Sequence, residues 1–178
     1  MKFLQLVPIG TPDIELLDWL RRELTEGFRV PCSIETPLDP GFAYHPERNQ
    51  HHSSELLARL QKDYVSKRTW RVLGVTEVDL YIPILTFVFG EAQMGGPCSA
   101  VSYNRLRQEF YGLPSDRDLL ARRLLTEAVH ELGHTLQLTH CPDYECVMAS
   151  SHAVEWIDIK RWTFCQDCAM KAQAHAHF

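Results

Sequence analysis

The stretch from His130 to Cys141, HELGHTLQLTHC, holds the residues of this chain best suited to chemistry. His130 and His134 are four residues apart, so on a helix their imidazoles share one face, about 6 Å apart along the axis, and can bind one ion. Glu131 points about 100° away around that axis, so its carboxylate can stay off the metal and act as a general base. His140, six residues beyond His134, is the obvious third ligand. A fourth position would stay open, as in catalytic zinc sites.

One residue departs from the extended form of this motif, because Gln137 stands where a glycine is usual. Glycine there permits the positive-φ turn that brings the third histidine back to the metal. A non-glycine residue in that conformation costs ~1–2 kcal/mol, which is small beside the ~10–16 kcal/mol of structural zinc binding. Gln137 therefore need not prevent His140 from binding. It leaves one alternative open: a non-catalytic zinc protein that binds peptides or has a structural role.

Four of the six cysteines follow the histidine motif as two pairs with zinc-site spacings. An all-thiolate site has no open position, so its role would be structural, tying the loop after His140 to the C-terminal helix. A redox function for CQDC would leave the other pair unused, and a nucleic-acid zinc ribbon fits poorly with an acidic chain. The two remaining cysteines, Cys32 and Cys98, are expected to be ordinary thiols. The four expected ligands are Cys141, Cys146, Cys165 and Cys168.

The succession HELGHTLQLTHC, PDYE, CVM and, after sixteen residues, CQDC resembles the archaemetzincin family, metzincin-clan zinc metallopeptidases of peptidase family M54. Every element of the family pattern is present except the glycine. SYNRLRQEFYG, residues 102–112, also has a family-like look, whereas the first 70 residues are similar only in length and pattern.

The resemblance implies a role for each matching position. His130, His134 and His140 would bind the catalytic zinc, Glu131 would be the general base, and Met148 would be the Met-turn residue beneath the histidines. The four cysteines would bind a second, structural zinc, so two Zn²⁺ are expected. Residues 87–93, FVFGEAQ, would form an edge strand that pairs with an extended peptide. Substrates would be short peptides, cleaved in an aminopeptidase-like manner.

The helix that must present the motif is the longest periodic segment, residues 115–138. Ser115 and Asp118 resemble a capping box, and an apolar stripe recurs at i, i+4. Before it, strands and helices alternate: strands at 2–8, 28–35, 71–85, 87–93 and 99–106, helices at 11–28 (N-cap Thr11) and 53–65. A C-terminal helix is expected over 150–173.

This order predicts an α/β (α+β) class with a mixed, twisted sheet and an antiparallel edge strand. Residues 1–178 would form a single metzincin-like domain. Its first part, residues 1–140, would hold the sheet, helices and active-site helix. The remainder, residues 141–178, would hold the Met-turn, the cysteine site and the C-terminal helix.

Five of the six histidines outside the motif lie in two polar segments. His45, His51 and His52 belong to a polar segment, residues 38–54, that is expected to be a loop, which favours solvated surface histidines over metal ligands. His175 and His177 belong to AHAHF at the end of the chain, where a frayed terminus is expected.

Composition limits the partners. The 178 residues are 45% hydrophobic and 23% charged with a net charge of −5, which gives no general attraction to nucleic acid or to anionic membranes. No apolar run approaches the ~20 residues that span a bilayer, and MKFLQLVPIG lacks the features of a signal peptide. We therefore expect a cytoplasmic, monomeric protein with a peptide substrate and neither nucleic acid nor membrane as partner.

Overall fold

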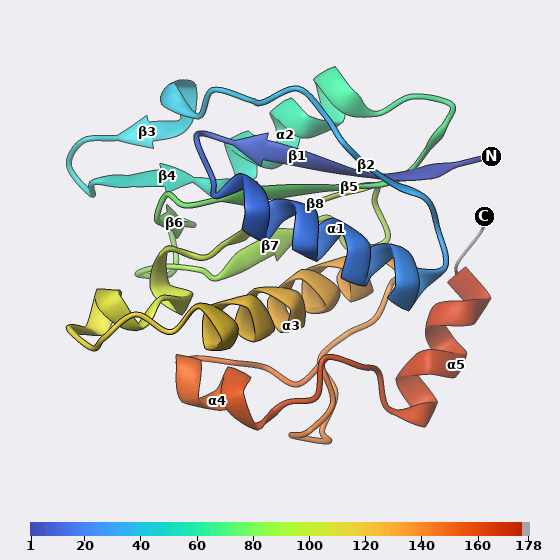
Figure 1. The fold of residues 1–178 in the computed structure, drawn as a ribbon. Helices are drawn as coiled ribbons and strands as arrows, with labels where there is room; N and C mark the ends of the chain where they lie inside the picture. Colours follow the sequence, from blue (N-terminus) through green and yellow to red (C-terminus); the bar gives the residue numbers. More distant parts are fainter. Residues whose placement is uncertain (176–178) are drawn as a thin grey trace.

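A five-stranded sheet of order β2-β1-β5-β8-β7 forms the centre of the computed structural model, which describes residues 1–175 (Figure 1). Four strands are parallel and β7 is antiparallel at one edge. The mixed α/β class and the antiparallel edge strand are therefore confirmed. His177 lies outside the described residues. The strands are β1 (Phe3–Ile9), β2 (Cys32–Ile34), β5 (Thr69–Thr76), β7 (Gly90–Ala92) and β8 (Cys98–Ser102).

Helices cover both faces of this sheet because its central strands are apolar on both sides. In β1, Leu4 and Leu6 pack into the core shared with helices α1 (Ile14–Phe28) and α3 (Arg117–Thr135). Val7 and Ile9 belong to the second core, under helix α2 (Ser53–Tyr64). Such doubly covered strands are continuously hydrophobic, as parallel strands usually are.

Helix α3 confirms the predicted active-site helix, with different ends. Its N-cap is Asp116 rather than Ser115, because the Asp116 carboxylate accepts the backbone N–H of Leu119 at 2.9 Å. The helix ends at Thr135, three residues earlier than predicted. Gln137 then takes φ = +64°, and the N–H of Leu138 donates to the carbonyl of Gly133 at 3.1 Å. This left-handed reversal directs the following residues back along the helix.

Helix α1 also starts at a different cap. Asp13, not Thr11, accepts the N–H groups of Glu15 and Leu16. The backbone N–H and the hydroxyl of Thr11 both donate instead to the carboxylate of Glu77. Thr11 is thus used to hold the end of β1 against the segment after β5.

Two strands of a second, three-stranded sheet of order β3-β4-β6 lie in the segment predicted to be a loop. Its strands are β3 (Tyr44–His45), β4 (Gln50–His52) and β6 (Leu80–Tyr81), with the 3₁₀ turn η1 (Gly41–Ala43) before them. Asn49, at φ = +52°, makes the tight turn into β4. The predicted strand 71–85 is accordingly two strands, β5 and β6, that belong to different sheets.

The C-terminal region contains two helices where one was predicted. They are α4 (Val154–Ile159) and α5 (Gln166–His175), and the 3₁₀ turns η2 (Asn104–Leu106) and η3 (Gln108–Tyr111) precede α3. The chain leaves α4 in extended conformation at Lys160, whose side chain is buried against α3. Among residues 1–175 no helix combines the length and apolarity needed to cross a membrane.

Candidate active site

A cleft of about 510 Å³ lies between helix α3 and the edge strand β7 with the segment before it. One wall is residues 85–92 and the floor is the N-terminal part of the histidine motif on α3. The loop residues 150–152 close the far side. Because β7 is the last strand of the central sheet, its outer edge borders this cleft.

The imidazoles of His130 and His134 meet on one face of α3. Their Nε2 atoms are 3.0 Å apart. His130 Nδ1 lies 2.8 Å from the carbonyl oxygen of Val147, and His134 Nδ1 lies 2.7 Å from that of Leu138. A carbonyl only accepts, so each neutral ring carries its proton on Nδ1. The two Nε2 lone pairs then point into one small space, an arrangement that suits a shared cation.

His140 completes a group of three imidazoles whose ligand nitrogens lie within 4.8 Å of one another. Its ring centroid is 5.4 Å from that of His130 and 5.1 Å from that of His134. The positive-φ conformation of Gln137 lets the chain reverse in this way despite the missing glycine. The three side chains could therefore hold one zinc ion with a further position open to the cleft.

Electrostatics favours neutral imidazoles here. Burial lowers the pKa of His130 well below its ordinary value, and the Lys160 ammonium adds to this effect. Burial likewise lowers the pKa of His134 and of His140. Neutral imidazole is the form that binds metal, so the donor set fits zinc.

Glu131 is buried, lines the cleft and does not belong to the group of three histidines that could bind the metal. A Cβ at Gly90 would lie 2.6 Å from Glu131 Cγ, so the close approach of β7 to this side chain depends on glycine. Burial raises the pKa of Glu131 well above its ordinary value, and the carboxylates of Glu127 and Glu91 raise it further. A carboxyl group in such a site can exchange protons near neutral pH.

Met148 is fully buried beneath the histidine motif. Its sulfur packs so closely on Gly133 that a side chain at that position would collide with it. The backbone carbonyl of Met148 accepts the N–H of Cys141 at 2.9 Å. This contact joins the end of the histidine motif to the turn that carries Met148.

The four predicted cysteines come together in space, with their sulfurs within 4.8 Å of one another. The Cys141 and Cys165 sulfurs are 3.8 Å apart. Tetrahedral zinc with Zn–S bonds of ~2.3 Å separates its sulfurs by about 3.8 Å. The N–H of Cys165 donates to the Cys146 sulfur at 3.3 Å, a contact that suits a thiolate. The donor set thus fits a closed zinc site better than a redox pair.

The two other cysteines lie away from this group. Burial raises the pKa of Cys32 to about 12 and that of Cys98 to about 12. Both are therefore protonated at neutral pH and poor nucleophiles, as expected for ordinary thiols.

Three charged residues near the site were not anticipated. Glu127 and Glu91 line the cleft, and Lys160, fully buried, lies with its Nζ 3.4 Å from both Glu127 Oε1 and the carbonyl of Val147. Glu127 precedes Glu131 by four residues and so shares its helical face, a signal visible in the sequence. Lys160 has no comparable signal, since it is a single lysine between two helices.

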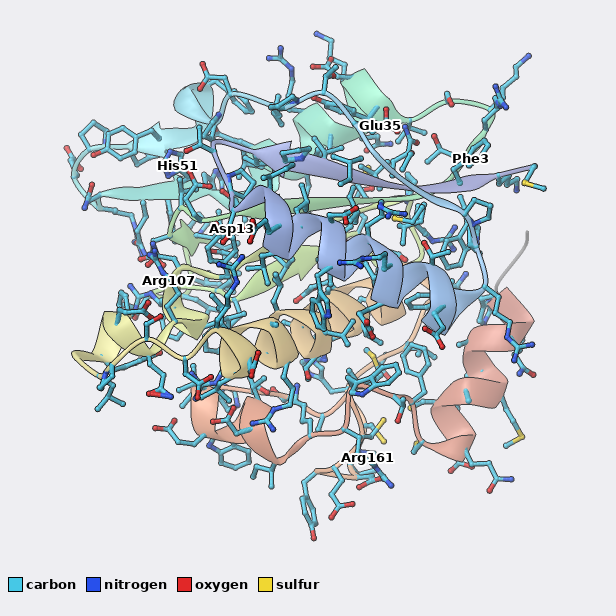
Figure 2. All side chains as sticks on the ribbon, in the orientation of Figure 1. Phe3, Asp13, Glu35, His51, Arg107 and Arg161 are labelled. Carbon is cyan, nitrogen blue, oxygen red and sulfur yellow. The ribbon has the colours of Figure 1, made fainter. Side chains whose placement is uncertain are left out.

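The histidines of the polar segment are separate from the cleft. Figure 2 labels His51, which lies in the small β3-β4-β6 sheet, far from Arg161 beside the cysteine-bearing loop. His45 and His52 approach each other and Glu55, at the start of α2. They are partly exposed, but they do not lie in an irregular loop.

Comparison with known proteins places these features in a family. Residues 42–174 match the model of peptidase family M54. The archaemetzincin of Methanocaldococcus jannaschii is 42% identical over 169 residues, 93% of this chain and 90% of the relative. The crystal structure of the Methanopyrus kandleri archaemetzincin superimposes with a TM-score of 0.81 at 32% identity, covering 98% of this chain and 94% of the other. A zinc-dependent peptidase from Methanocorpusculum labreanum gives a TM-score of 0.84 at 28% identity, covering 95% and 99% respectively.

Proposed function

We propose that this chain, which belongs to peptidase family M54 and is a zinc metallopeptidase, cleaves peptides in the cleft between β7 and α3. His130, His134 and His140 would bind the catalytic zinc. The observation that carries this proposal is the convergence of the two unprotonated Nε2 atoms at 3.0 Å, with His140 brought beside them. Backbone carbonyls on both Nδ1 atoms fix the rings in the tautomer that zinc requires.

Glu131 is proposed as the general base. Zinc held by the three histidines would polarise the scissile carbonyl and lower the pKa of a water molecule towards ~7. The Glu131 carboxylate accepts the proton of the attacking water and then delivers it to the leaving amine nitrogen. Its raised pKa supports the second half of this role, because a carboxyl group that keeps a proton briefly can pass it on.

The substrate is proposed to be a short peptide that lies extended along the outer edge of β7. Residues 90–92 are an antiparallel edge strand, so their free backbone groups can pair with another strand. Glu91 is among the residues that line the cleft, and its carboxylate accepts hydrogen bonds from the hydroxyls of Ser53 and Ser54 at the start of α2. Aminopeptidase-like cleavage of this peptide is proposed from the membership of the chain in the archaemetzincin family.

A second, structural zinc is proposed for Cys141, Cys146, Cys165 and Cys168, giving two zinc ions per chain. It would connect the loop after His140 with the start of α5. Met148, packed on Gly133, is the proposed Met-turn residue. Four further expectations stay predictions: a single domain, a monomeric state, a cytoplasmic location, and no nucleic-acid or membrane partner.

The Glu131→Ala variant tests this function. We expect it to retain two zinc ions per chain and to lose peptide hydrolysis, because the ligands remain while the proton acceptor is gone. A peptide-library digest with both proteins, analysed by mass spectrometry beside metal analysis, gives activity, specificity and zinc content together. Cleavage by the variant at the wild-type rate would disprove the base assignment. Full zinc content without any wild-type cleavage would favour the non-catalytic alternative.

A further inference from the structure

Outside the cleft, three side chains from three elements converge on one point. His45 lies on β3, His52 ends β4, and Glu55 is in the first turn of α2. Glu55 Oε1 is 3.1 Å from His52 Nδ1 and 3.7 Å from His45 Nε2. One ligand atom from each side chain lies within 4.8 Å of the other two. We propose that His45, His52 and Glu55 form a third metal site, for a divalent transition ion.

The separations match what one ion demands. Ligand atoms at ~2.0–2.2 Å from zinc in tetrahedral geometry lie about 3.3–3.5 Å from one another. The two distances from the carboxylate oxygen lie on either side of this value. Small rotations of partly exposed side chains would therefore complete the site without movement of the backbone.

Aromatic packing holds the two imidazoles in place. The ring of His52 stacks on Tyr81, with centroids 5.3 Å apart and planes 26° apart. His45 meets the same Tyr81 ring edge-on at 5.5 Å. Tyr81 is itself buried, and the Arg48 guanidinium lies 4.0 Å above its ring. Side chains restrained in this way lose less entropy on binding an ion.

The donor set selects the class of ion. Two imidazoles and one carboxylate suit zinc, nickel, cobalt, copper or iron(II), whereas calcium and magnesium favour oxygen ligands. The side chains of His45 and Glu55 are 46% and 42% exposed, which leaves room for water to complete the coordination. Without an ion, the same contacts would be only a surface His–Glu pair worth ~0–1 kcal/mol.

The site is remote from the proposed chemistry but connected to the cleft wall. Arg48, in the same β3-β4 hairpin, donates to the carbonyls of Leu85 and Thr86 at 3.0 and 3.1 Å. Both of these residues line the cleft. An ion at His45, His52 and Glu55 would tie this hairpin to the start of α2.

The test is a zinc titration of protein already loaded with its tightly bound zinc, using calorimetry and metal analysis after gel filtration. It is done in a His175→Ala, His177→Ala background, which removes the terminal histidines as a source of extra binding. We expect one additional zinc per chain, lost in His45→Ala and weakened at least tenfold in Glu55→Gln.

The matched control is His51→Gln, which removes a neighbouring β4 imidazole that is not in the group. It should keep the additional zinc. Circular dichroism establishes that each variant is folded, and Glu55→Gln conserves the shape of the side chain if His45→Ala disturbs the hairpin. The proposal would be overturned if the protein with His45, His52 and Glu55 intact bound no additional zinc. It would also be overturned if the additional zinc survived both His45→Ala and Glu55→Gln. Neither result would bear on peptide cleavage at the catalytic site.

Discussion

At the scale of single residues, Gln137 shows how a motif tolerates a substitution at its turn. It adopts the left-handed conformation that glycine would take, at φ = +64°. Its side chain lies against Gly95, where a Cβ would come within 2.8 Å of Gln137 Cγ. Gly95 in turn donates its N–H to the carbonyl of His134 at 3.0 Å. The strained turn is therefore supported by a neighbouring loop.

We predict that Gln137→Gly leaves zinc content and peptide turnover unchanged. Relief of the left-handed strain favours the variant by ~1–2 kcal/mol, whereas the greater freedom of glycine in the unfolded chain opposes it by ~0.4–1 kcal/mol. The free energy of unfolding, measured by urea denaturation, should therefore rise by about 0–1.6 kcal/mol. Gln137→Val is the informative control, because a β-branched residue resists this conformation and should destabilise the protein. A large gain in turnover for Gln137→Gly would show that the glutamine impairs catalysis.

Lys160 is a second residue whose surroundings define its role. Its ammonium is buried with the Glu127 carboxylate and approaches the carbonyl of Val147, the acceptor for His130. The charge pair therefore lies directly behind a proposed zinc ligand.

We predict that Lys160→Met destabilises the protein by about 3–5 kcal/mol, because it leaves the Glu127 carboxylate buried without its cation. Urea denaturation measures this loss. Adding Glu127→Gln should recover part of it, since a neutral amide is cheaper to bury than an unpaired charge. Equal stability of the single and double variants would contradict the pairing argument.

At the scale of elements, the segment between α3 and α4 contributes ligands to both proposed zinc sites. His140 and Cys141 are adjacent, and the Cys141 N–H donates to the carbonyl of Met148. Arg161 lies 3.5 Å from the Asp143 carboxylate on the same segment. A fixed cysteine site would thus hold His140 in place beside a strained Gln137.

We predict that loss of the cysteine-bound zinc weakens zinc binding at the histidines by at least tenfold. Cys165→Ser with Cys168→Ser removes two ligands from the cysteine site without touching the segment that bears His140. Competition with a zinc chelator measures the affinity that remains. The reciprocal variant, His130→Gln with His134→Gln, should keep one zinc. An unchanged affinity at the histidines would show that the turn does not depend on the cysteine site.

The sequence predicted elements well where a strong local signal existed. The amphipathic pattern of α3 and the ligand spacings both depend on residues close in the chain, and the structure contains the helix and both ligand groups. The two-residue strands β3 and β6 have too few residues to show a period, and they exist because they pair with β4. The break between α4 and α5 likewise depends on Lys160 reaching Glu127, a contact between residues 33 apart. Long-range pairing of this kind leaves no local pattern.

At the scale of the whole molecule, the acid sensitivity of folding follows from the buried histidines. When the catalytic site has no metal, burial lowers the pKa of His130 and His134 in the folded protein. In the unfolded chain both have the ordinary value of ~6.5. Below pH ~6.5 the unfolded state therefore binds more protons than the folded state. These two imidazoles therefore lower the free energy of unfolding as the pH falls through this range, by up to ~1.4 kcal/mol per pH unit for each proton, whereas Glu131, whose pKa is raised by burial, contributes in the opposite direction.

We therefore predict that, between pH 7.5 and 5.5, protein stripped of its histidine-bound zinc but with the cysteine-bound zinc kept loses more stability than the variant His130→Gln with His134→Gln. Urea denaturation at several pH values measures this slope. The variant lacks these two imidazoles but keeps Glu131, so its stability should fall less over the same interval. Zinc-loaded wild-type protein should hold its stability to lower pH, because protons must first displace the metal. Identical slopes for the stripped wild type and the variant would mean that other groups, and not these two imidazoles, control the acid response.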